Sequence, residues 1–159
     1  MRVIAVQSLQ VPARTTSAWT LRYGGAIAVL NLLWELLQLP LYTLWYEGDA
    51  RQIVLAVLHC TAGDLLIAGL SLLAALALVR PNGWPRQHSV ATSLLTLVLG
   101  LGYTVHSEWY NTTVTHLWAY SSHMPQIAGI GLSPIAQWLI IPCAAFWWAH
   151  RPSQRDPKR

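Results

Sequence analysis

The hydrophobic residues of this chain are gathered into four long stretches, separated by short segments rich in polar residues, glycine and proline. The stretches cover about residues 21–45, 52–79, 89–110 and 126–149. Each is close to the roughly 20 residues that an α-helix needs to cross the hydrocarbon core of a bilayer. Helices are expected because backbone polar groups cannot stay unpaired in lipid. The pattern predicts an all-α integral membrane bundle of four transmembrane helices, formed by residues 1–159 as a single domain.

The composition supports this reading and excludes other classes of protein. Hydrophobic residues make up 54% of the 159 residues and charged residues only 10%, whereas soluble domains carry roughly 25% charged residues. A surface with so few charges excludes a disordered chain, a coiled coil and an ordinary cytosolic enzyme. The two cysteines, Cys60 and Cys143, are far apart in hydrophobic stretches, so we expect neither a disulfide framework nor a CxxC pair.

Basic residues are distributed unevenly among the connecting segments. The loop near Glu47 contains only Arg51, and the segment 111–125 contains no Lys or Arg. Positive charge favours the cytoplasmic side of a membrane, so we expect both termini, including the tail 151–159, in the cytoplasm. The short loops favour a bacterial inner membrane. Topology also accounts for the net charge of +4 without a nucleic-acid partner. The remaining nine basic residues are Arg2, Arg14, Arg22, Arg80, Arg86, Arg151, Arg155, Lys158 and Arg159.

Polar residues interrupt the first hydrophobic stretch at helical spacing. Asn31, Glu35 and Gln38 are four and three residues apart, and Tyr42 follows four residues later. Residues at these spacings share one face of a helix. Ionisable groups inside a bilayer are costly and usually functional, so we expect this face to line the bundle interior or a water-filled cavity. A hydrogen-bonded helix seam is the simpler alternative, but it would need only the amides and not Glu35.

The other three stretches carry polar residues as well. The second contains His59 and Asp64, the third ends with Tyr103, His106 and Glu108, and the fourth contains Gln137. With both termini inside, these groups would run from the outer surface to the middle of the membrane. We therefore expect a funnel that opens outward.

The loop 111–125 is expected to cover the mouth of this funnel. It is aromatic and polar, and its Trp118 is suited to the headgroup level of the membrane. An ordinary interfacial loop is the alternative for this segment.

Acid/base chemistry is the leading interpretation of these groups. A carboxyl and an imidazole on opposite sides of a substrate are suited to proton transfer or hydrolysis. The lipid bilayer would deliver a lipid-soluble or amphiphilic small molecule as substrate. The predicted catalytic residues are Glu35, His59, Asp64, His106 and Glu108, and the predicted substrate-binding residues are Asn31, Gln38, Tyr103, Trp118 and Gln137.

A metal is an alternative use of the same side chains. Carboxylate and imidazole groups bind divalent transition metals, so Glu35, His59, Asp64, His106 and Glu108 are also the candidate metal ligands. The sequence contains no HExxH motif and no tight histidine cluster to support such a site. A haem held by His59 and His106 is the least favoured cofactor.

Two further functions compete with an enzyme. A carrier or channel for protons or metal ions would use the same groups, but none of the stretches has an ionisable residue in its inner half. A homo-oligomer or a membrane partner would then have to complete the path. A non-catalytic subunit or assembly factor would use the polar faces only as helix seams. The substitution Glu35→Gln separates a site from a seam, because it removes the charge and keeps the shape and hydrogen bonding.

Overall fold

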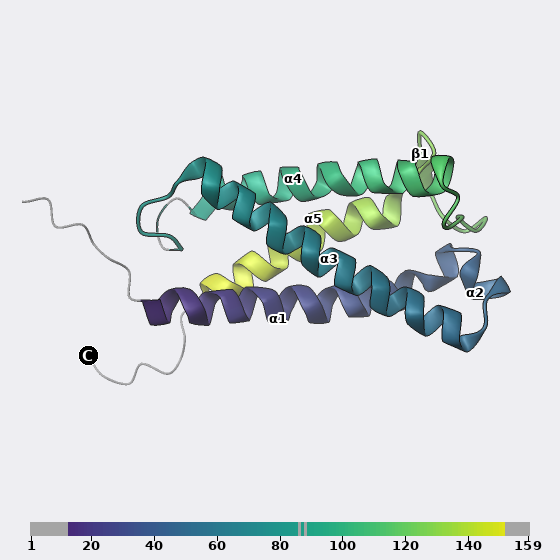
Figure 1. Ribbon diagram of the computed structural model, residues 1–159, viewed down its shortest axis with the longest axis horizontal. Coiled ribbons are helices and arrows are strands. Elements are labelled where there is room, and N and C mark those ends of the chain that lie inside the picture. The colour runs from purple at the N-terminus through teal and green to yellow at the C-terminus, as the bar shows by residue number, and fades with distance from the viewer. Residues whose placement is uncertain (1–12, 86, 88, 152–159) are drawn as a thin grey trace, which may run out of the picture.

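The computed structural model describes residues 13–85, 87 and 89–151. Its four long helices are α1 (Ala13–Gln38), α3 (Ala50–Val79), α4 (Ser89–Trp109) and α5 (Leu132–His150), which run side by side (Figure 1). All four contain a segment long and apolar enough to cross a membrane. This confirms the predicted all-α bundle of four helices that are long and apolar enough to span a membrane. The orientation with both termini inside remains a prediction.

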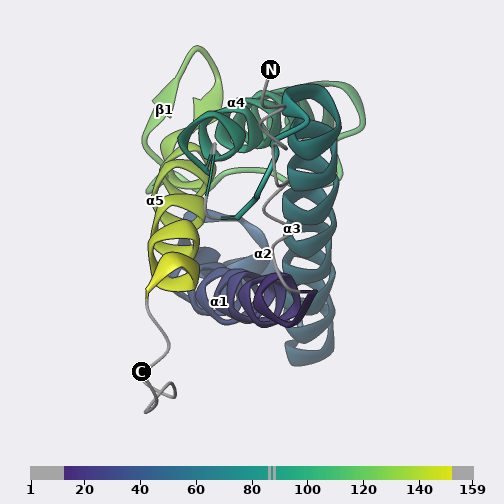
Figure 2. The ribbon, with the colours of Figure 1, turned by 90° about the vertical axis from the view of Figure 1, so that its left-hand side faces the viewer.

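The helices occupy the corners of a square when the bundle is viewed along its length (Figure 2). Helix α1 packs beside α3 and α5, and helix α4 packs beside the same two. Consecutive long helices are therefore neighbours, while α1 faces α4, and α3 faces α5, across the diagonals. We call the end where α1 begins and α5 finishes the terminal end.

The buried side chains repeat about every four residues along each helix. This spacing keeps them on one face, while leucine, valine and isoleucine side chains cover much of the exposed surface. The buried face of α1 comprises Trp19, Tyr23, Ile27, Asn31 and Glu35, and that of α4 comprises Thr92, Thr96, Gly100, Thr104 and Glu108. The core changes character along its length. It is aromatic at the terminal end and polar toward the opposite end.

The first hydrophobic stretch folds differently from the predicted helix 21–45. Helix α1 starts earlier, at Ala13, and ends at Gln38, followed by a single 3₁₀ turn (η1, Leu39–Leu41) and the short helix α2 (Leu44–Glu47). Pro40 explains this break, because proline has no N–H to continue the helical ladder. Tyr42 is consequently in extended backbone, with φ −116° and ψ 148°, and does not continue the helical face of Glu35.

The fourth predicted stretch, residues 126–149, begins six residues before the helix that the structure shows. Residues 126–131 form a hairpin of β1 (Gln126–Ile127) and β2 (Ile130–Gly131), and α5 begins only at Leu132. The turn residues Ala128 and Gly129 both have positive φ, 53° and 78°, as a two-residue type I′ hairpin turn requires. The second stretch agrees closely with α3, which a capping box between Asp49 and Gln52 starts. Helix α4 ends at Trp109 and continues into a π-type turn (η2, Tyr110–Val114).

Two connecting segments are joined at the end of the bundle opposite the termini. Thr43 N donates to Ala119 O at 3.0 Å, and Ser121 N donates to Leu41 O at 2.9 Å. Between these bonds Tyr42 and Tyr120 pair as an antiparallel bridge, with ring centroids 5.6 Å apart. We call residues 40–43 and 119–121 the clasp. It holds the loop after α1 against the loop after α4.

Candidate functional site

A single amide nitrogen gathers acceptors from two helices in the middle of the bundle. Gln137 Nε2 on α5 lies 3.1 Å from Glu35 Oε1, 2.9 Å from Asp64 Oδ2 and 2.8 Å from Asn31 Oδ1. All four side chains are buried. The structure thus brings together four of the predicted site residues, and we call Glu35 and Asp64 the carboxyl pair.

Further donors hold the carboxyl pair in place. Gln38 Nε2 donates to Glu35 Oε1 at 2.8 Å, and Trp138 Nε1 lies 3.3 Å from Asp64 Oδ1. Ser133 Oγ in turn donates to Gln38 Oε1 at 2.8 Å. Within the described ranges, none of the hydrogen bonds to the pair comes from a lysine, arginine or histidine. The carboxyl pair is therefore held by neutral donors alone.

The position of Trp138 depends on Gly100, a glycine of the neighbouring helix α4. A Cβ atom added to Gly100 of α4 would lie 2.1 Å from Trp138 Cζ3. No side chain larger than hydrogen fits there unless the indole moves. Gly100 thus allows the indole N–H of Trp138 to reach Asp64.

A third buried carboxyl group, that of Glu108, contacts the clasp. The Tyr120 hydroxyl donates to Glu108 Oε2 and accepts from Gly131 N at 3.0 Å. Glu108 is buried on α4, and Tyr120 connects it to the start of α5. Burial raises the pKa of Tyr120 above its usual range, which keeps the hydroxyl protonated as a donor.

The phenol of Tyr42 is influenced by carboxyl groups from two helices. Burial, and next the charge of Glu108, raise the pKa of the Tyr42 phenol well above its usual value, and Glu35 also contributes.

Five side-chain atoms of the described residues are buried without a hydrogen-bond partner: Trp19 Nε1, Tyr23 Oη, Thr61 Oγ1, Thr104 Oγ1 and Trp118 Nε1. Thr61 and Thr104 belong to the helices that carry Asp64 and Glu108. Thr61 precedes Asp64 by three residues, and Thr104 precedes Glu108 by four, so each lies one helical turn from a carboxyl group. Buried polar groups are nearly always satisfied in folded proteins. The hydroxyls of Thr61 and Thr104 consequently offer hydrogen bonds to a polar group bound beside the carboxyls.

The structure does not bring the predicted histidines to this region. His59 on α3 and His106 on α4 are exposed on the outside of the bundle, and Tyr103 is 55% exposed. His106 stacks on Tyr110 with ring centroids 6.1 Å apart. The helical repeat explains this placement. His59 is five residues before Asp64 and His106 is two residues before Glu108, and neither spacing puts two side chains on the same face of a helix. The predicted carboxylate–imidazole arrangement, and the haem geometry with it, is therefore not formed.

A metal centre has no support in the described residues. Among them, no group of three or more His, Cys, Asp and Glu side chains is placed to hold a metal ion. The carboxyl pair instead shares its space with the amides of Gln137, Gln38 and Asn31.

An aromatic cluster occupies the core on the terminal side of Asn31. Ile27 is only 1% exposed, and Trp19, Tyr23 and Phe146 pack beyond it, with centroids of Tyr23 and Phe146 4.8 Å apart. We call the buried carboxyls and amides between the clasp and Asn31 the polar region. On the terminal side of Asn31, the other buried polar side chains of the described residues are the hydroxyls of Ser71, Thr92 and Thr96.

Several residues of the site were not identified from the sequence. Trp138, Gly100, Ser133 and Tyr120 have residue types common in membrane helices and loops, and only the spacing of four between Gly100, Thr104 and Glu108 could have indicated a shared face. No protein-family model matches this chain, and no curated protein or solved structure is detectably similar to it.

Proposed function

We propose that this protein is an integral membrane enzyme that performs acid/base chemistry on a lipid-soluble or amphiphilic substrate. The observation that carries the proposal is the convergence of Glu35 and Asp64 on one amide nitrogen, with neutral donors only. Two buried carboxyls this close share protons rather than ionising independently, which is how pairs of acids divide acid and base roles in enzymes.

The surroundings of the pair favour a shared proton. Gln137 Nε2 carries two hydrogens and lies within 3.1 Å of three acceptors, while Glu35 Oε1 also accepts from Gln38 Nε2 at 2.8 Å. These neutral donors supply no positive charge, so two negative charges on neighbouring buried carboxyls would be costly. We infer that one proton is held within the pair and is the one available for transfer to a substrate.

The surroundings of the pair favour a substrate with a small polar group and an apolar body. Leucines such as Leu36, Leu37 and Leu66 cover the exposed faces of the helices beside it. The hydroxyls of Thr61 and Thr104 offer unused hydrogen bonds. A substrate that enters from the lipid would place its polar group at these hydroxyls and its apolar part toward the membrane.

A proton carrier is less well supported. Conduction requires a path through the whole bundle, and the aromatic cluster around Ile27 and Tyr23 closes the terminal side of the polar region. A purely structural role for these polar side chains is also less well supported. The amides of Asn31, Gln38 and Gln137 would be enough to connect the helices by hydrogen bonds, and two buried carboxyls would not be required.

The test compares lipid extracts of membranes that contain the wild-type protein, Glu35→Gln or Glu47→Gln. Glu47 is an exposed residue of α2 and is the matched control. We expect one lipid-soluble compound to be consumed and another to be formed by the wild type and Glu47→Gln, but not by Glu35→Gln. Similar melting temperatures would show that all three fold. Identical extracts from all three would refute the enzyme proposal.

A second measurement separates the carrier from the enzyme. Proteoliposomes containing a pH-sensitive dye are given a proton gradient. We expect no protein-dependent proton flux. A flux that disappears in Glu35→Gln would overturn the enzyme proposal in favour of a carrier.

A further inference from the structure

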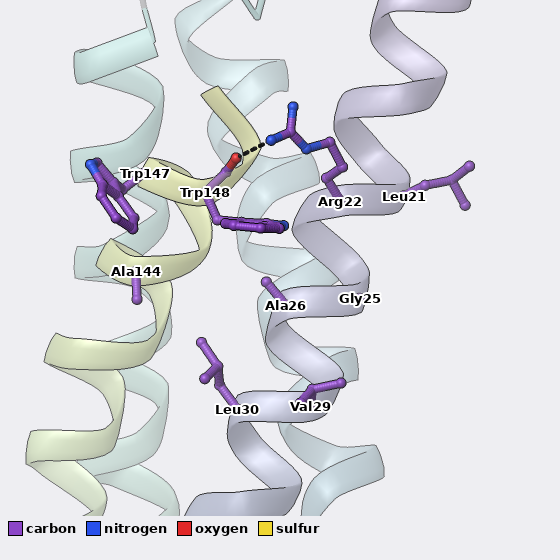
Figure 3. Close-up of a pocket in the computed structure, with 9 residues that line it drawn as sticks. All are labelled: Leu21, Arg22, Gly25, Ala26, Val29, Leu30, Ala144, Trp147 and Trp148. Atoms are coloured by element: carbon purple, nitrogen blue, oxygen red, sulfur yellow. Dashed lines mark hydrogen bonds between the residues drawn. The ribbon is translucent and has the colours of Figure 1, made fainter. Parts of the chain in front are cut away.

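A groove of about 630 Å³ opens between α1 and α5 near the terminal end (Figure 3). Small residues create the hollow, because Gly25 and Ala26 of α1 lie opposite Ala144 of α5. A Cβ atom added to Gly25 would meet nothing within 4 Å. On α1 the groove ends at Leu30, five residues before Glu35, and none of its lining residues belongs to the proposed active site.

One side chain in this otherwise apolar groove is charged. Figure 3 shows that Arg22 Nη2 donates to Trp148 O, at 2.8 Å. Arg22 Nη1 also donates to Arg151 O at 2.6 Å. Both acceptors are carbonyls at the end of α5, where the helical i+4 donors run out, and Trp148 O also accepts from Arg151 N at 3.2 Å. The guanidinium has five N–H groups, so three remain for an external acceptor.

A second guanidinium lies close to the first. The Arg151 guanidinium stacks 3.5 Å from the ring of Trp147, and that of Arg22 lies 5.5 Å from the ring of Trp148. Among the described residues, Arg22 lines the groove and Arg151 lies against its Trp147 and Trp148, and neither positive charge is paired with an acidic side chain.

We propose that this groove binds one phospholipid with an anionic headgroup. An acyl chain lies along Gly25, Ala26 and Ala144, and the headgroup phosphate accepts hydrogen bonds from Arg22 and Arg151. Tryptophan and arginine side chains together are typical of the interfacial level of a membrane, and basic pockets between transmembrane helices bind anionic lipid headgroups. The charge complementarity selects an anionic phospholipid over an uncharged hydrocarbon.

The test uses native mass spectrometry of the detergent-solubilised full chain, titrated with dioleoyl phosphatidylglycerol or with dioleoyl phosphatidylcholine. The wild type should bind one molecule of phosphatidylglycerol at least about fivefold more tightly than phosphatidylcholine, as expected for an added charge contact. Gly25→Leu fills the groove and should abolish this binding. Gly24→Leu is the matched control, because a Cβ at Gly24 also has open space but Gly24 does not line the groove.

The headgroup contact is tested separately. Arg22→Gln should remove the preference for phosphatidylglycerol, and Arg22→Lys should largely retain it. The proposal is wrong if the wild type binds both lipids equally, or if the two glycine variants behave alike. A lipid-free dimer that dissociates in Gly25→Leu would also overturn it, because a second copy of the chain would then fill the groove. Melting temperatures confirm that each variant is folded.

Discussion

Asp64 and Gln137 meet across a diagonal of the bundle, from helices α3 and α5 that have few direct backbone contacts. Gln137 Nε2 donates to Asp64 Oδ2 at 2.9 Å, and the adjacent Trp138 directs its indole N–H to Asp64 Oδ1. Two consecutive residues of one helix therefore hold both oxygens of a carboxyl on the opposite helix. Helices α3 and α5 are thus connected across the bundle by hydrogen bonds between side chains.

Replacing Gln137 with leucine removes the shared donor. Glu35, Asp64 and Asn31 would lose the two N–H hydrogens that they share, and a buried group left unpaired costs about 1–3 kcal/mol. We expect Gln137→Leu to lower the melting temperature strongly in detergent. Gln126, which is exposed in β1, provides the control Gln126→Leu. Equal stability of the two variants would contradict the central role of Gln137.

Replacing Gly100 with alanine tests the position of Trp138. The added Cβ would overlap the indole, and overpacking of this kind costs about 1–3 kcal/mol. Gly102→Ala is the control, because nothing lies within 4 Å of a Cβ there and alanine is a better helix former than glycine by about 1 kcal/mol. Thermal unfolding should show Gly100→Ala destabilised and Gly102→Ala unchanged or more stable. The reverse order would show that Trp138 is free to move.

Tyr120→Phe removes the hydroxyl that connects Glu108 to Gly131. The loss of a donor to a buried carboxyl should cost about 1–3 kcal/mol and loosen the clasp. Limited proteolysis in the segment 115–125 should therefore become faster, together with a lower melting temperature. Tyr110→Phe removes an exposed hydroxyl of η2 and is the control. If both variants are digested at the wild-type rate, the hydroxyl of Tyr120 does not hold the clasp.

Alkaline pH should destabilise the protein through Tyr42. Because its pKa is raised in the folded state, the folded chain keeps a proton that the unfolded chain loses above about pH 10. Stability should therefore be constant below that pH and fall above it, by at most about 1.4 kcal/mol per pH unit for this one group. Tyr42→Phe should make the decline shallower in unfolding experiments across that range. An unchanged slope would contradict the raised pKa.

The number of spans and the core of the site follow from simple periodicity. Asn31, Glu35 and Gln38 share a helical face at any register, and a carboxyl such as Glu35 has to turn inward in a membrane. His59 and His106 could not be placed in this way, because a histidine tolerates the outer face and each is flanked by residues that do face inward. The sequence pattern places the start of α5 too early, because residues 126–131 are apolar enough for a helix. The positive φ of Ala128 and Gly129, which makes this segment a hairpin, cannot be read from hydrophobicity. Gly100 and Trp138 fit each other across two helices, and no single-helix pattern contains that information.

The clasp has a consequence for how the chain is assembled. It connects segments about eighty residues apart, while the turn that follows α3 lies at the other end of the bundle. The first half of the chain and the second half can each enter the membrane as a helical hairpin, and only their correct pairing brings Leu41 and Thr43 to Ser121 and Ala119. The hydrogen bonds of the clasp therefore require that the two halves are already paired. A chain divided within the turn at Asn82 and Gly83 should regain the native bundle when its two halves are produced together.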